Sequence, residues 1–238
     1  MVRRGPERVR VGPWRGDARI AHIMPLSDAP PLTSEMIRHC RTVLERRGYD
    51  SVVTGALARR EQQGFLEDGF EVREELHLLA HDLVAQPLVP RHPAGVRLRR
   101  GRRWERGRTL EVDARAFPRF WQLDRSGFDE AMTATPQARF GVATDGRVIG
   151  YAIAGRAGSR GYLQRLAVDP TVVGQGIGAA LVVDALTWMR ARDVRRAVVN
   201  TQVANERALR LYLRLGFRLQ PAGLAVLTRP LADRQPAR

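Results

Sequence analysis

A single cysteine, Cys40, occurs among the 238 residues of this chain. One thiol excludes an internal disulfide framework and a metal site built from several cysteines. No window holds the roughly 18 consecutive apolar residues that a transmembrane helix requires. The basic start of the chain is not followed by the apolar segment of a secretory signal. These absences predict a cytoplasmic protein that holds no metal and does not enter a membrane.

Lysine is absent as well, because all 40 basic side chains belong to arginine, and the formal net charge is +15. A charge of this size is compatible with nucleic-acid binding. A surface shaped only for phosphate contacts would normally use lysine too, whereas arginine has GC-rich codons, so we favour a compositional bias over a nucleic-acid role. In either case the charge favours an acidic ligand such as a coenzyme.

Three prolines and a glycine interrupt the chain between Gln86 and Gly95, in QPLVPRHPAG. Such a stretch continues neither a helix nor a central strand, so it is interpreted as a linker. Apolar residues make up 44% of the chain, which is enough for a packed core. The sequence therefore predicts two domains, residues 1–90 and 91–238, of which the second has the size of an ordinary domain.

The segment after the linker predicts alternating strands and helices, which indicates an α/β fold with a mixed sheet. Asp145-Gly146 between two strand-like runs predicts a hairpin. A short helix is expected to begin at the N-cap Asn205 and to end at Gly216. The other expected elements are strands over 96–100, 161–168, 195–203 and 224–229 and helices within 109–122, 123–136 and 178–192.

The first segment repeats part of this pattern in residues 36–72. Both copies show a helix, a β-branched strand and a short helix that ends in Gly-Phe, so that Gly69-Phe70 matches Gly216-Phe217 and Phe65 matches Tyr212. We interpret the match as an internal repeat, although any two βα units share such a pattern in outline. The first copy is predicted to be an incomplete half-domain.

Three glycines stand at alternate positions, Gly174, Gly176 and Gly178, in the stretch VDPTVVGQGIGAAL. Glycine allows positive φ and close approach of the backbone, and the start of a helix offers free N–H groups, so the stretch predicts a phosphate site. The first segment has no such glycine stretch, because PLSDAPPLTSEM stands in the corresponding place. The stretch also fits a dinucleotide-binding fingerprint, but it follows several earlier strands and the next strand ends at Asn200 rather than at an acidic residue, which argues against that fold.

The glycine stretch, preceded by LAV-DP and followed by N-x-x-A-x-x-x-Y-x-x-x-G-F, resembles the GCN5-related N-acetyltransferase (GNAT) superfamily, most clearly over residues 147–217. The resemblance implies the GNAT fold, an α/β fold with a mixed, mostly antiparallel central sheet flanked by helices, here preceded by a smaller, incomplete GNAT-like half-domain. It also implies that acetyl-CoA, as co-substrate, binds the residues Leu166, Ala167, Val168, Val173, Gly174, Gly176, Ile177, Gly178, Ala179 and Asn205. The family usually has Arg or Gln at the position of Val173, so this departure is expected to weaken the binding of acetyl-CoA without abolishing it.

The resemblance makes Tyr212 the general acid that protonates the coenzyme thiolate; the alternative is a tyrosine packed beneath the sheet. A phenol is a suitable donor to a basic thiolate, and backbone N–H groups can stabilise the oxyanion. Members that act on protein N-termini often have a glutamate where this chain has Asn200, and no histidine follows His92. The remaining candidates for the general base are Glu111, Asp113, Asp129, Glu130 and Tyr151, or a chain of water molecules.

The aromatic group Phe117, Phe120 and Trp121 is expected either to line the acceptor pocket or to pack in the core. The sequence thus predicts an N-acetyltransferase that moves an acetyl group from acetyl-CoA to a primary amine of a small molecule or a protein N-terminus. The alternative is a regulatory module that binds an acyl-CoA with little or no turnover. The sequence leaves the oligomeric state open, a homodimer included.

Overall fold

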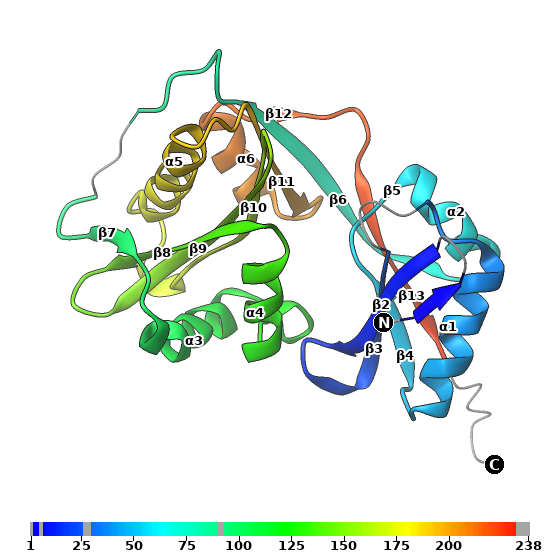
Figure 1. Cartoon of the computed structure of the whole chain (residues 1–238). Helices are drawn as coiled ribbons and strands as arrows, with labels where there is room; N and C mark the ends of the chain where they lie inside the picture. Colours follow the sequence, from blue (N-terminus) through cyan, green and yellow to red (C-terminus); the bar gives the residue numbers. More distant parts are fainter. Residues whose placement is uncertain (1, 5–6, 26–29, 90–92, 232–238) are drawn as a thin grey trace. The chain divides into compact units, whose positions relative to one another are not determined.

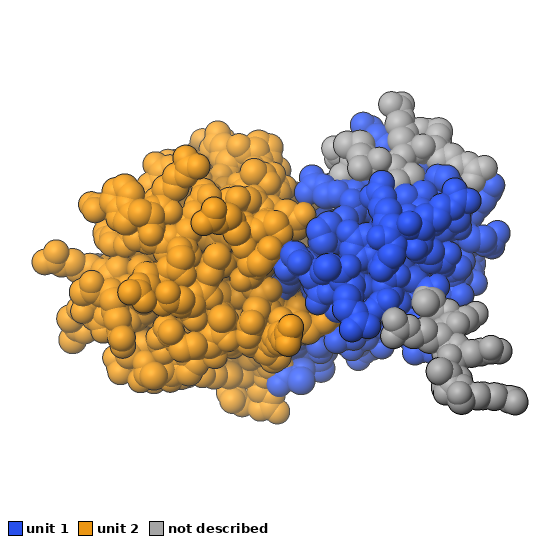
Figure 2. All heavy atoms as spheres, turned by 90° about the horizontal axis from the view of Figure 1, so that it is seen from below, with its two compact units in different colours: residues 1–78, 200–204, 221–238 blue, residues 79–199, 205–220 orange. Residues whose placement is uncertain are grey.

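A computed structural model describes residues 2–4, 7–25, 30–89 and 93–231 of the chain (Figure 1). They group into two compact units, shown in Figure 2. Unit 1 comprises residues 1–78, 200–204 and 221–238, and unit 2 comprises residues 79–199 and 205–220. Within the described part of the chain, no helix combines the length and the apolar character that crossing a membrane demands.

Unit 2 is built on a sheet in the order β7-β8-β9-β10-β11. Its strands are β7 (Arg97–Arg100), β8 (Gln137–Thr144), β9 (Val148–Ala157), β10 (Arg160–Val168) and the first part of β11 (Arg196–Gln202). The pairs from β7 to β10 are antiparallel, and only β10 and β11 run parallel. Gly146 has a φ of 102° in the turn between β8 and β9, as the predicted hairpin requires.

Helices cover both faces of this sheet (Figure 1). They are α3 (Arg106–Ala116), α4 (Arg125–Thr133), α5 (Ile177–Arg190), α6 (Glu206–Arg214) and the 3₁₀ turns Arg103–Glu105, Arg119–Trp121 and Pro170–Val172. Helices α3 and α4 pack on β8, β9 and β10, with Val112 of α3 and Phe128 of α4 buried in the core between them and the sheet. Helix α5 packs on the same strands through a separate core that includes Leu181 and Leu186. The sheet is therefore enclosed on two sides, which fixes the direction of β10 and the start of α5.

The strands of unit 1 lie in the order β1-β2-β3-β4-β13-β6. Its strands are β1 (Val2–Arg4), β2 (Glu7–Trp14), β3 (Asp17–Pro25), β4 (Ser51–Thr54), β5 (Leu57–Ala58), β13 (Leu224–Pro230) and the first part of β6 (Glu71–Asp82). Its helices are α1 (Ser34–Arg46) and α2 (Arg59–Glu67). Thr33 caps α1, because its side chain accepts from the Met36 N–H at 3.2 Å. One core of buried side chains, including Ile37, Phe65 and Leu227, holds these elements together.

The two segments matched in the sequence have the same local structure. Gly69 and Gly216 both follow a short helix with positive φ, 78° and 88°. The next residue in each copy donates its N–H five residues back at 3.0 Å, from Phe70 to Phe65 and from Phe217 to Tyr212. The paired rings lie 5.1 Å and 5.5 Å apart. The correspondence therefore extends from the sequence to the backbone and to ring packing.

The expected α/β fold with a mostly antiparallel sheet and flanking helices is confirmed. One expectation about the second segment is wrong, because the strand over 224–229 does not close its sheet. Instead β13 lies in unit 1 between β4 and β6, where Ala225, Val226 and Leu227 are buried. In unit 2 the short strand β12 (Arg218–Leu219) pairs with Leu79 and Ala80 at the end of β6. The division into residues 1–90 and 91–238 stays a prediction, and residues 90–92 of the expected linker lie outside the described residues.

Candidate active site

Strand β10 is paired along its length on one side only. Its pairing with β11 covers Arg160–Tyr162, whereas its pairing with β9 continues to Val168. An irregularity between Leu163 and Arg165 interrupts the register with β9, as in a β-bulge. Leu166, Ala167 and Val168 follow it, opposite Ala152, Tyr151 and Gly150. Among the described pairings of unit 2, the other edge of these three residues has no strand, so its N–H and C=O groups are available to an extended ligand.

The glycine loop forms an open bend between β10 and α5. Gly174 and Gly176 have φ values of 89° and 80°, and Gly176 is the N-cap of α5. A Cβ at either position would meet nothing within 4 Å, so glycine is required by the backbone conformation and not by crowding. The first helical hydrogen bond runs from the Ala180 N–H to the Gly176 carbonyl at 3.0 Å. The amides of Ile177, Gly178 and Ala179 therefore precede the helical ladder and are available to an anion.

Asp169 fixes the entry into this loop, and sequence reasoning did not single it out. Its buried carboxylate accepts from the Thr171 N–H at 3.1 Å and from Arg115 Nη2 at 2.7 Å. Burial alone would raise the pKa of Asp169, but hydrogen bonds from Thr171 and Arg115 bring it below its usual value. The Asp-Pro pair that ends the strand was the available signal, since aspartate commonly caps a turn. Val173 lies between this turn and Gly174 and is half-buried.

Asn205 caps helix α6, as predicted. Its Oδ1 accepts from the Ala208 N–H at 3.0 Å. The cap uses one lone pair of this oxygen, and the side-chain NH₂ group has no hydrogen bond among the described residues. The cap fixes the start of the helix that carries Tyr212.

Tyr212 is buried in unit 2, with 5% of its surface exposed. Its ring packs against Phe217 at 5.5 Å between centroids. No hydrogen bond among the described residues involves its hydroxyl group. Burial raises the pKa of Tyr212 above its usual value, and the positive charge of Arg165 offsets this in part. The phenol therefore stays protonated at neutral pH and has a proton to donate.

A buried ionic cluster lies between α3 and the sheet, and it joins three residues that are far apart in the sequence. Asp113 is fully buried and accepts from Tyr151 Oη at 2.5 Å. Its two oxygens also accept from Arg165 Nε at 2.7 Å and Arg165 Nη2 at 2.8 Å. The Leu123 N–H donates to the same carboxylate at 2.6 Å. Both carboxylate oxygens of Asp113 therefore accept two hydrogen bonds each from groups of the protein itself.

Arg165 connects this cluster to the aromatic group. Its guanidinium carbon lies 3.5 Å from the centroid of the Phe117 ring, and its Nη2 donates to the Trp121 carbonyl at 2.7 Å. Phe120 packs edge-on against Trp121 at 4.9 Å. Phe117, Phe120 and Trp121 are all half-buried, so they combine core packing with surface that a substrate could contact. Sequence reasoning missed Arg165, because an arginine within an apolar strand gives no local signal of its partner.

These contacts reduce the set of candidate bases. Asp113 and Tyr151 use their polar atoms in the hydrogen bonds of the buried cluster. Burial raises the pKa of Tyr151 above its usual value, and the negative charge of Asp113 raises it further. Glu111 pairs with Arg108 at 2.8 Å, and Asp129 pairs with Arg106 at 2.9 Å, both on exposed helix surface. Glu130 and ordered water remain.

The family model for the acetyltransferase (GNAT) family matches residues 104–217, which includes β8 to β11, α3 to α6 and the glycine loop. The mycothiol acetyltransferase of Actinosynnema mirum is 31% identical over 157 residues, which cover 60% of this chain and 51% of that protein. The human N-alpha-acetyltransferase 30 is 43% identical over 58 residues, which cover 24% of this chain and 16% of that protein. The chain spans from about two fifths to about half of the length of the mycothiol acetyltransferases it matches.

Solved structures share the fold at low sequence identity. A tandem GNAT protein from the clavulanic acid biosynthesis pathway has a TM-score of 0.68 at 13% identity, over 91% of this chain and 77% of the other. A GCN5-related N-acetyltransferase from Sphaerobacter thermophilus has a TM-score of 0.63 at 16% identity, over 96% of this chain and 78% of the other. Residues 104–217 of this chain therefore match the GNAT acetyltransferase family in sequence, and the solved structures share the fold.

Proposed function

We propose that this protein transfers an acetyl group from acetyl-CoA to a primary amine of a small molecule or a protein N-terminus. The observation that carries the proposal is the open glycine bend at the start of α5, next to the one-sided edge of β10. In this proposal the amides of Ile177, Gly178 and Ala179 bind the pyrophosphate, and the edge of Leu166–Val168 pairs with the pantetheine arm. The Asn205 NH₂ group is a further donor to that arm.

The transfer is proposed to be direct. The amine nitrogen attacks the thioester carbonyl, a C–N bond forms, and the C–S bond breaks to release the coenzyme thiolate. Backbone N–H groups of β10 stabilise the oxyanion, and Tyr212 Oη gives its proton to the sulfur. The proton that the amine loses passes to water or to a base that remains to be identified. No covalent enzyme intermediate is required, since holding the two substrates in line supplies much of the acceleration.

The second candidate function is an acyl-CoA-binding regulatory module with little turnover. It is favoured by one observation, which is that four of the five side chains considered as bases are buried or ion-paired within the described residues. Release of thiol from acetyl-CoA, measured over a panel of small amines and N-terminal peptides, separates the two functions. The chain contains no lysine, so acetylation of its own lysine side chains cannot contribute to that signal.

We also propose a tandem arrangement, in which unit 1 is an incomplete GNAT-like half-domain without a pyrophosphate loop. Support comes from the matched helix, strand, helix and Gly-Phe turn of the two copies, and from the likeness to a solved tandem GNAT protein. Phe65 stands where the second copy has Tyr212, so unit 1 lacks the proposed acid.

Replacing both Gly174 and Gly176 by alanine is expected to weaken acetyl-CoA binding at least tenfold. Alanine at positive φ costs about 1–2 kcal/mol per residue, so the bend would change its conformation and its amides would no longer converge. Isothermal titration calorimetry with acetyl-CoA measures the effect. The matched control is Gly158→Ala, which has a φ of 56° in the turn between β9 and β10 and open space around it.

The control variant should lose stability by a similar mechanism while keeping its affinity for the coenzyme. Equal affinities of the double variant and the wild type would contradict the proposed pyrophosphate site.

Ionisation of Tyr212 is not expected to lower kcat at any pH below about 10. Burial raises the pKa of this phenol above its usual value, and only the protonated form can act as an acid, so its contribution persists through the alkaline range and disappears above it. Steady-state rates between pH 7 and 10 measure this. An alkaline limb near pH 8.5 that is present in the wild type and absent in Tyr212→Phe would show that the hydroxyl ionises too early for this role.

A further inference from the structure

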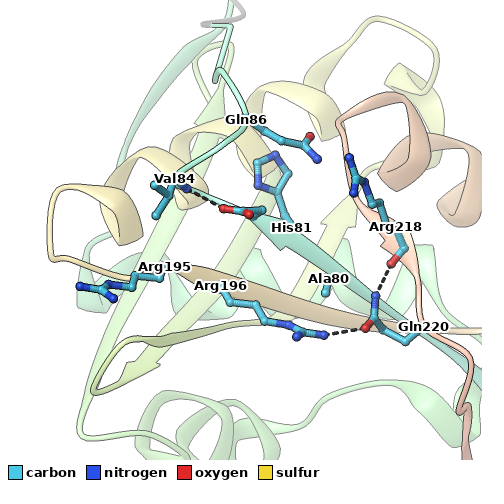
Figure 3. Close-up of a pocket in the computed structure, with 9 residues that line it drawn as sticks. Ala80, His81, Val84, Gln86, Arg195, Arg196, Arg218 and Gln220 are labelled. Atoms are coloured by element: carbon cyan, nitrogen blue, oxygen red, sulfur yellow. Dashed lines mark hydrogen bonds between the residues drawn. The ribbon is translucent and has the colours of Figure 1, made fainter.

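A pocket lies in unit 2, away from the glycine loop. Its volume is about 430 Å³. It is formed by the end of β6, the start of β11 and the segment around β12 (Figure 3). The polar residues that matter here are His81, Gln86, Arg195, Arg196, Arg218 and Gln220.

The pocket is rich in positive charge that carboxylates do not neutralise. Arg195, Arg196 and Arg218 line it, and none of the three forms an ion pair within the residues that the structure describes. Arg196 Nη2 donates to Gln220 Oε1 at 2.6 Å, which holds one edge of that guanidinium and leaves its other N–H groups available. The one carboxylate at the pocket, Asp82, accepts from the Val84 and Ala85 N–H groups at 2.9 Å and 3.0 Å. An anion would therefore meet a net positive field.

The base of the pocket holds a buried imidazole without hydrogen bonds. His81 is fully buried, and neither of its ring nitrogens has a hydrogen-bond partner. Burial lowers the pKa of His81 below its usual value, and the nearby backbone groups of Leu215 and Asp82 offset this in part without meeting hydrogen-bond geometry. A buried polar group left unpaired costs about 1–3 kcal/mol, and a ligand would recover this only if it displaced the side chains that cover the ring.

Gln86 and His81 lie side by side in the wall of the pocket. Gln86 lies against Gly216, where an added Cβ would come within 2.1 Å of the Gln86 Oε1 atom and 3.3 Å of His81 Nε2. Glycine at this position thus makes room for the amide beside the imidazole. In Figure 3, Gln86, His81 and the guanidinium group of Arg218 face one another. Guanidinium and amide N–H groups together form a donor set for oxygen anions.

We propose that this pocket binds the phosphate group of a small phosphorylated molecule. Phosphate matches the planar N–H pairs of arginine, which can bind two of its oxygens at once, and the pocket has room for more than the phosphate itself. The exposed arginines attract the anion, and the half-buried Gln86 amide, which lies beside His81 and faces Arg218, would contact its oxygens.

The proposed phosphate pocket is distinct from the coenzyme site. In the pairing of β11 with β10, Arg196 lies opposite Arg160, the first residue of β10. The glycine loop follows Val168, the last residue of the same strand. Eight residues at about 3.3 Å each put these ends about 26 Å apart. Acetyl-CoA bound at the loop should therefore not displace a ligand from the pocket.

Calorimetry on the full chain at low ionic strength tests the proposal, with inorganic phosphate and glycerol 3-phosphate as probes. We expect saturable binding with a dissociation constant below about 1 mM, unchanged by saturating acetyl-CoA. Arg196→Gln combined with Arg218→Ala should weaken binding at least tenfold, and the control Arg147→Ala, on the exposed β8–β9 turn, should not. Tighter binding of glycerol 3-phosphate than of phosphate would indicate that the pocket recognises a phosphate ester; equal binding would assign the free ion.

Nitrogen-15 NMR of the histidine rings gives a second readout, in which the His81 signals should shift on addition of phosphate. The proposal is overturned if no saturable heat is observed, if the arginine variants bind as the wild type does, or if acetyl-CoA competes with the probe. None of these results depends on acetyl transfer, so they leave the proposed function to its own test.

Discussion

Tyr212→Phe is expected to lower kcat for acetyl transfer by about 100-fold to 10,000-fold, the usual effect of losing a general acid. The variant removes one oxygen that has no hydrogen bond among the described residues, so no buried partner is left unsatisfied. The ring keeps its place against Phe217. Affinity for acetyl-CoA should therefore change by less than about threefold. A fall in kcat with an unchanged dissociation constant is the pattern of an interaction made only in the transition state.

The measurement is thiol release from acetyl-CoA, with calorimetry for binding. The chain's own thiol does not interfere, because Cys40 is fully buried and burial raises its pKa to about 11. Tyr162→Phe is the control, since Tyr162 lies on β10 in the stretch that pairs with β11 and is only half-buried. If Tyr212→Phe kept more than about a tenth of the wild-type rate, the acid would have to be another group or water.

Elements with strong local signals could be predicted from the sequence. The Asp145-Gly146 turn, the Asn205 cap and the helix that ends at Gly216 all appear where they were expected, because each depends on the conformational preference of one or two residues. The glycine loop belongs to the same class. Positive φ at Gly174 and Gly176 follows from a local requirement, which the spacing of the glycines made visible.

Features that depend on distant partners could not be predicted. β13 pairs with β4 and β6 of unit 1, and its sequence gives no sign of which sheet it joins. The proposed phosphate pocket combines residues near 81, 195 and 218, each of which looks like an ordinary surface or strand residue in its own segment. The buried cluster joins Asp113 to Arg165 across 52 residues. Asp113 was a candidate base in the sequence, and only its buried partners reveal a different role.

The role of Asp113 leads to the second large effect. Asp113→Ala is expected to lower the free energy of unfolding by about 3–5 kcal/mol, because it breaks a buried ion pair and leaves one charge without compensation. Arg165, whose side chain is 10% exposed, would keep only the Trp121 carbonyl as a described hydrogen-bond partner. The buried hydroxyl of Tyr151 would lose its acceptor at the same time. Urea denaturation followed by circular dichroism measures the loss.

Two variants distinguish the loss of a buried pair from a general effect of removing a carboxylate. Asp129→Ala removes an ion pair with Arg106 whose side chains are 51% and 35% exposed, so it should cost less than about 1 kcal/mol. Asp113→Ala with Arg165→Met removes both buried charges and should recover part of the stability lost in the single variant. The double variant would still lack the guanidinium that holds Phe117 and the Trp121 backbone. If this positioning matters to the acceptor, KM for the amine should stay raised even where stability returns.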